Sequence, residues 1–518
     1  MHLRRVGLLT CVQLLTAAAS VCQAIAVVHI FGATRAIEVF FAASVIQQMM
    51  LRLLQTGQLF EVTLPNYISV RNGAGRAAAN EVASLVLNWT LCIATAMAIL
   101  LWFVAPLLVS LATPGFSDAD RQVALWMFRT LVPLVIIQVA SGLLTALGNA
   151  ESAFGRFEAM GLIAIVVSLA FILLAHETLG AWVMVVALWI NQSLTLLGRL
   201  TLVAISGLRY YPVLRSKHLS IWQVYKNVIS GMPTVFSGSL LNLVVVSQLS
   251  LLPVGSLAVA QYAQSFLLKL RGLIVRPTSV VFFTDIADSV GHYVEEVREK
   301  VTAWLHQFIL LASLSIAILW TPLADLLAAV LHSETFSLQH VSQTTMILRC
   351  LLPSLVLTGI GVIYQKLNVS LLRFRPQYVA MFFGNLIAAV IAWLVIGRFG
   401  LYGFVVAFFA HSFIYAVASY SVTFVWQSDY LAVAKVSFLL RCAALCVLAI
   451  FAGRFVSSLV HTILPAPELD RWEFLLAGTG ALLLQAVITV LIAWLLGVGE
   501  IRRLAAVGNS QLRRLARR

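Results

Sequence analysis

Apolar runs of 20 or more residues recur along the whole chain, and they constrain its fold more than any other feature. A run of about 20 apolar residues is long enough to cross a bilayer as one helix. The composition agrees, because 61% of the 518 residues are hydrophobic and only 10% are charged, whereas about a quarter of the residues in soluble domains are charged. The polar/apolar alternation of an outer-membrane barrel is not seen. The sequence therefore predicts an all-α polytopic membrane protein with about fourteen transmembrane helices.

An internal repeat is readable in the sequence. The two copies are related by one constant offset in residue number, 349 − 129 = 220, and three pairs of residues mark it: Arg129 and Arg349, Pro133 and Pro353, Gly180 and Gly400. One repeat contains six predicted spans, which is an even number, so both copies enter the membrane in the same direction. This pattern predicts two parallel six-helix repeats followed by a C-terminal helix pair, an architecture typical of transporters with a site between the two halves.

The repeat divides the chain into five predicted parts. They are an N-terminal six-helix lobe, a basic cytoplasmic linker, a C-terminal six-helix lobe, an extra helix pair and a basic cytoplasmic tail. These parts cover residues 1–206, 207–220, 221–426, 427–497 and 498–518, respectively.

The net charge of +14 is distributed unevenly between the two sets of loops. Arginines and lysines cluster in alternate loops and in the tail, and this asymmetry places both termini in the cytoplasm by the positive-inside rule. The tail arginines predict contact with anionic membrane lipids. An RNA-binding tail is the alternative, but the placement of the charge predicts no nucleic-acid partner.

Charges also lie inside the apolar stretch 36–65, which contains Glu38, Arg52 and Glu61. An arginine in the hydrocarbon costs at least ~2.5–3.5 kcal/mol, so such charges usually face a cavity or a partner. We interpret this stretch as the wall of a polar chamber. The alternative is an ion pair buried between packed helices.

Three further residues predict a moving gate. Gly231 and Pro233 interrupt the seventh predicted span, and Pro277 interrupts the eighth. Proline removes a helical hydrogen bond and bends the helix. A static kink is the alternative.

The sequence offers no pattern for a cofactor or a metal. No phosphate-binding loop is present, the ten histidines form no ligand-spaced cluster, and the six cysteines show no zinc spacing. If an ion gradient drives the protein, the candidate titrating groups are Glu38, Asp285, Asp325 and His411, with simple packing as the alternative for each. The polar segment 285–300 is predicted to form an amphipathic helix on the cytoplasmic face.

Several short motifs, in order along the chain, resemble the MurJ/MviN-type lipid flippases of the MOP superfamily. They lie at 31–33, 38–41, 52–57, Pro65, 113–116, 155–157, 252–256, Tyr262 with Ala263, and 400–407. The resemblance implies transport of a polyprenyl-pyrophosphate-linked saccharide across the bacterial inner membrane. That cargo is either a lipid II-like peptidoglycan precursor or an exopolysaccharide or O-antigen unit. Membrane lipids and cell-envelope biosynthesis proteins are the implied partners.

The cargo-binding residues are predicted from the resemblance at Arg52 and Glu38 and from neighbouring polar and charged residues elsewhere. They are Arg52 for the pyrophosphate, Lys269 and Arg271 for additional positive charge, and Glu38, Gln23 and Ser265 as polar neighbours. The chain departs from the family at two places, because Gln23 and Ala24 replace an Arg-Asp pair and Ser265 replaces an arginine. The extra helix pair resembles the family's tail-binding groove.

Two rival functions stay open. An ion-coupled multidrug exporter of the same superfamily would carry an acidic, aromatic chamber, whereas the predicted chamber is positive. An integral-membrane glycosyltransferase or ligase would need a catalytic carboxylate on a sizeable outer loop, and the outer loops are short. We therefore expect a transporter and not an enzyme.

Overall fold

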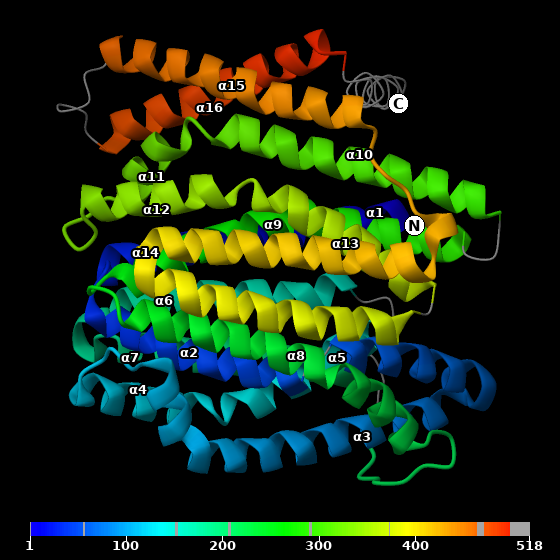
Figure 1. Cartoon of the computed structure of the whole chain (residues 1–518). Helices are drawn as coiled ribbons and strands as arrows, with labels where there is room; N and C mark the ends of the chain where they lie inside the picture. Colours follow the sequence, from blue (N-terminus) through cyan, green and yellow to red (C-terminus); the bar gives the residue numbers. More distant parts are fainter. Residues whose placement is uncertain are drawn as a thin grey trace. The chain divides into compact units, whose positions relative to one another are not determined.

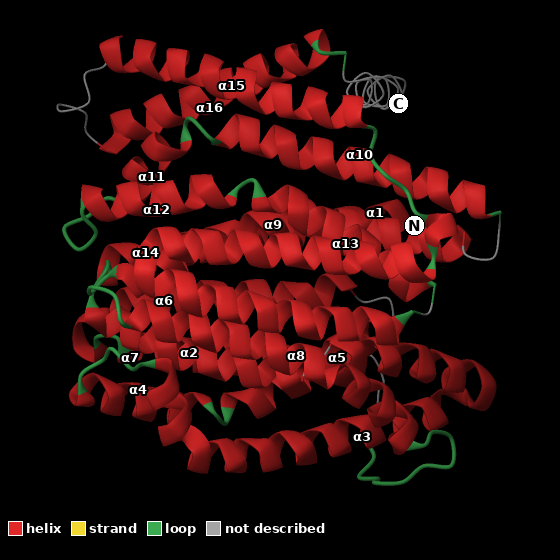
Figure 2. Cartoon of the chain, viewed as in Figure 1, coloured by secondary structure: helices red, strands yellow, loops and turns green. Residues whose placement is uncertain are grey.

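The computed structural model describes residues 2–54, 57–150, 154–205, 209–289, 293–371, 373–463 and 471–497. Within these ranges the regular elements are helices, with no strand (Figure 1, Figure 2). They are α1 (His2–Phe31), α2 (Arg35–Leu54), α3 (Gly57–Ala112), α4 (Asp118–Leu131), α5 (Leu134–Ala150), α6 (Phe154–Leu179), α7 (Trp182–Ile205), α8 (Ile221–Ser250), α9 (Ser256–Ser289), α10 (Val294–Leu319), α11 (Leu323–Leu331), α12 (Leu338–Leu351), α13 (Ser354–Ser370), α14 (Phe374–Trp426), the short η1 (Ser428–Tyr430), α15 (Val436–Ile463) and α16 (Arg471–Leu495). The predicted all-α fold is confirmed.

Eleven helices in the described part of the chain are long and apolar enough to cross a membrane, or up to twelve if the bent pair α12 and α13 counts as one span. Two of the helices are longer than one membrane crossing requires. α3 has 56 residues and α14 has 53, and each joins two helices across a kink at a glycine with positive φ, Gly75 (86°) and Gly400 (59°). A crossing takes about 20 residues, so α14 is long enough for two. Fourteen spans are compatible with these helices, and that number stays a prediction.

The sequence repeat is visible in the helix boundaries. A break at Pro133 separates α4 from α5, and a break at Pro353 separates α12 from α13, as expected because proline cannot donate to the preceding turn. All four boundaries of the second pair are shifted from those of the first by the offset that separates Pro353 from Pro133. The N-caps also correspond, because the side chains of Ser117 and Ser337 each accept a backbone N–H at the start of α4 and α12. The predicted repeat is seen in the helix boundaries, and its parallel orientation stays a prediction.

The chain forms two compact units. Unit 1 comprises Met1–Tyr262 with Asn385–Phe404, and unit 2 comprises Ala263–Gly384 with Val405–Arg518. These units are defined by contacts within each, whereas the five predicted parts are defined by the sequence repeat, so the predicted parts stay a prediction. The tail 498–518 lies outside the described residues.

In unit 1, α2 is the most enclosed of the candidate spans. Of its apolar window 67% is buried, against 17–50% for the others. It packs against α4, α8, α3 and α5. The neighbouring helices also pack against one another through hydrophobic clusters. One such cluster, where α3, α5 and α6 meet, contains Tyr67, Ala83, Leu147 and Phe157. Glu38, which is buried on α2, is therefore placed among protein rather than among lipid tails.

In unit 2, the C-terminal pair α15 and α16 packs on α10 and α11 (Figure 1). Leu310, Phe438 and Leu445 form part of the shared core. Gln485 of α16 donates hydrogen bonds to the carbonyls of Ala317 (2.9 Å) and Ala449 (2.7 Å), so one buried amide ties three helices together. A buried amide keeps its place only when such partners are present.

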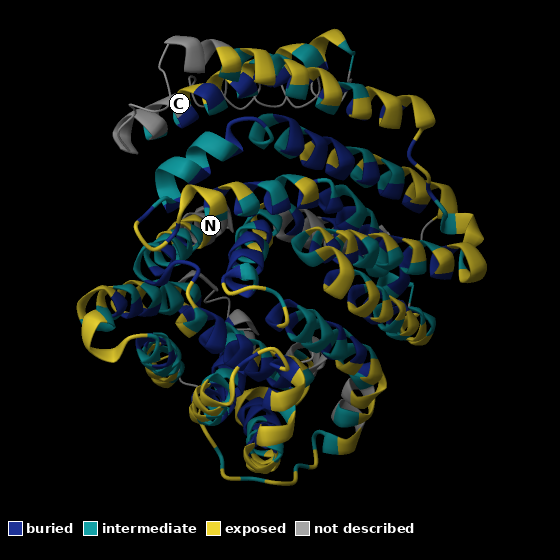
Figure 3. Ribbon diagram, turned by 60° about the vertical axis from the view of Figure 1, so that its left-hand side comes forward, coloured by how far each residue is buried: buried dark blue, intermediate teal, exposed yellow. Residues whose placement is uncertain are grey.

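The outward surface of both units is apolar. Large side chains such as Phe103 (75% exposed) and Leu174 (84%) are exposed, and many helices carry both exposed and buried residues (Figure 3). Contiguous apolar surface of this extent is typical of contact with lipid rather than water. Multi-pass membrane insertion follows from these helices.

One local prediction is wrong. Segment 285–300 does not form a separate surface helix, because α9 extends to Ser289 and α10 already begins at Val294. Its charged residues instead extend a span, as the ion pair between Glu296 and Lys300 (3.1 Å) on α10 illustrates. Charge density alone does not distinguish the end of a long helix from a separate amphipathic one.

Candidate functional site

Glu38 lies near the start of α2, and its carboxylate holds the start of α9. Its Oε1 accepts hydrogen bonds from the backbone N–H groups of Gly255 (2.8 Å), Leu257 (3.0 Å) and Ala258 (3.4 Å). The first N–H groups of a helix have no partner inside the helix, and the helix dipole favours a negative charge there. Glu38 therefore caps α9 from a helix that is distant in the sequence.

The other carboxylate oxygen of Glu38 pairs with Arg35, whose Nη1 lies 3.0 Å away. The side chain of Glu38 is 1% exposed, and the Arg35 guanidinium lies over the ring of Phe116 at 4.6 Å. We call Arg35, Glu38 and the N–H groups of Gly255, Leu257 and Ala258 the Glu38 clamp.

A second contact supports the clamp from the turn between α1 and α2. The Tyr262 hydroxyl of α9 donates to the carbonyl of Gly32 (3.0 Å), and the ring of Phe41 packs edge-on against Tyr262 at 5.3 Å. Gly32 adopts a positive φ of 54° in this turn, a conformation that glycine tolerates without strain. In the described conformation Glu38 is enclosed, so the predicted contact between Glu38 and cargo would require the clamp to open.

Arg52 lies at the opposite end of α2 and differs from Glu38 in its exposure and in its bonding. Its side chain is exposed, although α2 is the most enclosed span. Within the described residues it makes no hydrogen bond and no ion pair, and the alternative of a buried ion pair is not tested there. Glu61 belongs to the residues whose side chains are not described. Arg52 thus has an exposed guanidinium that no described residue binds.

Gln23 is half-buried on α1. Its amide donates to the hydroxyl of Ser168 on α6 at 3.3 Å, which links the two helices. Gln23, Glu38 and Arg52 all belong to unit 1, and none of them bonds directly to another.

The remaining predicted cargo residues belong to unit 2. Ser265, Lys269 and Arg271 follow one another along α9 and are half-buried. The Lys269 ammonium lies 5.6 Å from the centre of the Phe266 ring, a distance at which a cation–π attraction operates.

Arg271 is brought together with groups from α13 and α14. It lies within electrostatic range of His411 and Tyr415 on α14, and the Tyr415 hydroxyl donates to the side-chain oxygen of Gln365 on α13. The sequence singled out Arg271 and His411 separately and missed Tyr415 and Gln365. The available signal was the spacing of His411 and Tyr415, which places both on one face of a helix.

The predicted hinge residues lie within continuous helices. Pro233 is inside α8, which runs unbroken from Ile221 to Ser250, and Pro277 is inside α9, with its side chain outside the described part. Next to Pro233, the Asn385 amide of α14 donates to the Thr234 carbonyl (3.2 Å) and the Ser237 hydroxyl (3.1 Å). Gly231, which also lies inside α8, is buried. Hinge motion and static kink both stay open.

The proposed ion-coupling groups are dispersed. Glu38 belongs to the clamp, His411 lies near Arg271, and Asp325 lies on α11. Asp285 is among the residues whose side chains are not described. In the described part of the chain no group of three or more His, Cys, Asp or Glu side chains is arranged to hold a metal ion.

A family model matches the sequence, and several solved structures are similar in fold. The family model described as "Lipid II flippase MurJ" matches residues 27–466. The fold is similar to that of "Lipid II flippase MurJ, inward closed conformation", with a TM-score of 0.71 and 16% identity over 96% of this chain and 99% of that chain. No curated protein matches the sequence.

Two multidrug transporter structures are also similar in fold. An inward-facing multidrug resistance MATE family transporter of the MOP superfamily gives a TM-score of 0.63 at 15% identity, over 83% of this chain and 94% of that chain. A eukaryotic MATE transporter gives 0.60 at 17% identity, over 83% and 98%. The family match covers most of the chain. This chain belongs to the MurJ lipid II flippase family.

Proposed function

We propose that the protein moves a polyprenyl-pyrophosphate-linked saccharide across the bacterial inner membrane by alternating access. The cargo is lipid II-like or carries an exopolysaccharide or O-antigen unit. Membership of a lipid II flippase family supports this class of cargo. The observation that carries the proposal is Arg52, an exposed guanidinium on the most enclosed span that pairs with no other described residue.

The chemistry of the cargo requires such a group. A pyrophosphate that crosses the hydrocarbon without a partner would leave its charges unsolvated, which costs many kcal/mol. A guanidinium presents a fork of N–H donors that matches phosphate oxygens. Arg52 engages the pyrophosphate, and Lys269 and Arg271 supply further positive charge.

The Glu38 clamp is the proposed gate of this cycle. The distribution of basic loops predicts that both termini lie in the cytoplasm, and in that orientation the turn after α1 lies on the outer side. The clamp closes that side by joining the turn and α2 to the start of α9. Release of cargo outward therefore requires the bonds of Glu38 and Tyr262 to break.

The decisive experiment is complementation of a bacterial strain depleted of its lipid II flippase. Wild-type protein is expected to restore growth if lipid II is carried. Arg52→Ala should abolish that rescue, and Arg52→Lys should restore part of it, because a lysine keeps the charge but loses the fork.

Arg398→Ala is the matched control, since Arg398 is likewise exposed and makes no described bond. Normal rescue by Arg52→Ala at wild-type expression would remove the assigned role of Arg52. If wild-type protein fails to rescue, surface delivery of an exopolysaccharide or O-antigen unit is measured with the same variants.

A multidrug exporter is the second candidate, because the fold also matches MATE transporters. It predicts resistance to cationic drugs upon expression. The positive charge of Arg52, Lys269 and Arg271 opposes a cationic substrate. A gain of drug resistance that survives Arg52→Ala would favour the exporter.

A further inference from the structure

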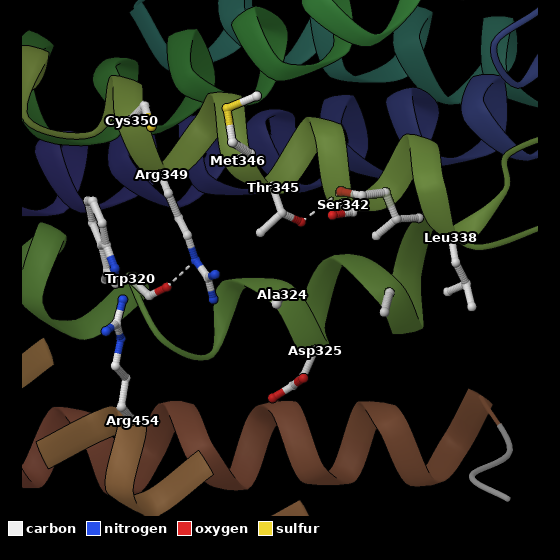
Figure 4. Close-up of a pocket in the computed structure, with 12 residues that line it drawn as sticks. Trp320, Ala324, Asp325, Leu338, Ser342, Thr345, Met346, Arg349, Cys350 and Arg454 are labelled. Carbon is white, nitrogen blue, oxygen red and sulfur yellow. Dashed lines mark hydrogen bonds between the residues drawn. The ribbon is translucent and has the colours of Figure 1, made fainter. Parts of the chain in front are cut away.

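A pocket of about 420 Å³ lies in unit 2 among α11, α12 and α15, and no predicted cargo-binding residue lines it (Figure 4). Its charged side chains are Asp325 from α11, Arg349 from α12 and Arg454 from α15. In Figure 4 Arg349 and Arg454 extend toward each other beside Trp320. The three charges thus converge from three helices.

Arg349 is held in place by the helix break before Pro322. Its Nε donates to the carbonyl of Trp320 (2.6 Å), and its Nη2 donates to that of Thr321 (2.9 Å). These carbonyls lie where α10 has ended and α11 has not begun, so they lack helical partners. A guanidinium carries five N–H donors, and those that remain are available in the pocket.

Arg454 adds the second positive charge from outside the repeat. It is exposed on α15, and within the described residues it makes no hydrogen bond or ion pair. Arg454 and Asp325 both lie within electrostatic range of Arg349. Two cations against one anion leave the pocket net positive, so its chemistry favours an anionic ligand.

The equivalent arginine of the first repeat has different surroundings. Arg129, the repeat counterpart of Arg349, lies over the rings of Trp102 (5.5 Å) and Trp126 (5.4 Å). These indoles cover its guanidinium. The residue that corresponds to Trp126 is Met346, and Arg349 lines an open pocket instead.

We propose that this pocket binds the phosphate group of an anionic membrane lipid. Two guanidinium groups suit phosphate oxygens, and the exposed hydroxyl-bearing Ser342 adds a polar contact on the wall. Apolar lining residues such as Leu338 and Met346 suit the adjoining apolar part of a lipid. The site is separate from the residues predicted to bind the cargo's pyrophosphate, because Arg52, Lys269 and Arg271 do not line it.

Native mass spectrometry of the purified full chain tests the proposal, with phosphatidylglycerol as the anionic probe and phosphatidylcholine as the net-neutral comparison. Wild-type protein should retain phosphatidylglycerol in preference to phosphatidylcholine. Arg454→Gln should weaken that binding about ten-fold or more, since one charge-assisted contact to phosphate is lost. Asp325→Asn should strengthen it, because removing this carboxylate raises the positive charge of the pocket.

Arg398→Gln is the matched control, being an exposed arginine that does not line the pocket. Competition by inorganic phosphate would identify free phosphate as a sufficient ligand, and failure to compete would identify the lipid headgroup; both results support the site. Equal binding by wild-type and Arg454→Gln protein, or equal losses in Arg454→Gln and Arg398→Gln, would overturn it. Unchanged thermal midpoints without lipid exclude misfolding as the cause of a loss.

Discussion

The Glu38 clamp makes a prediction that separates a long-range helix cap from an incidental contact. Replacing Glu38 by Ala removes the acceptor for the N–H groups of Gly255, Leu257 and Ala258 and leaves Arg35 without its partner. The side chain is 1% exposed, so water does not readily take its place. The N-terminus of α9 is expected to loosen.

The magnitude follows from the same contacts. Removing one partner of a buried ion pair typically costs about 3–5 kcal/mol, and loss of a helix N-cap by itself costs about 0.5–2 kcal/mol. These two costs overlap, because one carboxylate makes both interactions. We therefore expect a loss of about 3 kcal/mol, which corresponds to roughly a hundred-fold change in the opening equilibrium.

Hydrogen exchange of the backbone amides at 255–258 is the appropriate assay, since it reads the opening of the clamp rather than unfolding of the whole chain. In Glu38→Ala their exchange should accelerate by about two orders of magnitude. Glu38→Asp should give a smaller change, because the charge is kept while the reach is shortened.

The surface pair of Asp118 and Arg121 provides the control. Both this pair and the pair of Arg35 and Glu38 are three residues apart on a helix. Their nitrogen–oxygen distances are similar (3.1 Å and 3.0 Å), but Asp118 is fully exposed. Exposed pairs contribute little, so Asp118→Asn should leave exchange at 255–258 unchanged. If Glu38→Ala also leaves these amides protected, the clamp does not hold α9 and the reasoning fails.

Two further predictions concern packing. Tyr262→Phe should lower stability by about 0.5–1.5 kcal/mol, the usual net value of one hydrogen bond, because the hydroxyl's bond to the Gly32 carbonyl is lost; a thermal midpoint equal to wild type would contradict it. Gly359→Ala should cost about 1–3 kcal/mol in thermal unfolding, because an added Cβ would lie 1.6 Å from the Phe308 ring. In the control Gly480→Ala the Cβ would meet nothing within 4 Å, so that variant should be neutral or slightly stabilising, and equal effects of the two alanines would refute the assignment.

Much of the fold could be predicted from the sequence because the signals are local. A run of apolar residues specifies a span through its own transfer energy, and a proline specifies a break through its own missing donor. The repeat offset read from Arg129 and Arg349 recurs at every boundary of α4, α5, α12 and α13. The prediction of a separate helix at 285–300 was wrong because the surroundings of a polar helix end, and not its own charges, decide whether it continues a span.

The sequence by itself determined the membrane class, the repeat, the family resemblance and the identity of the charged residues within spans. Only the tertiary structure decided what those charges do. Glu38 and Arg52 share one helix and one kind of sequence signal, yet the first is enclosed by amides from a distant helix and the second is exposed and pairs with no described residue. That Arg349 and Arg454 line one pocket could not be predicted from the sequence either. The physical reason is that the energy of a charge in a membrane depends on the groups that surround it, and those groups come from distant helices.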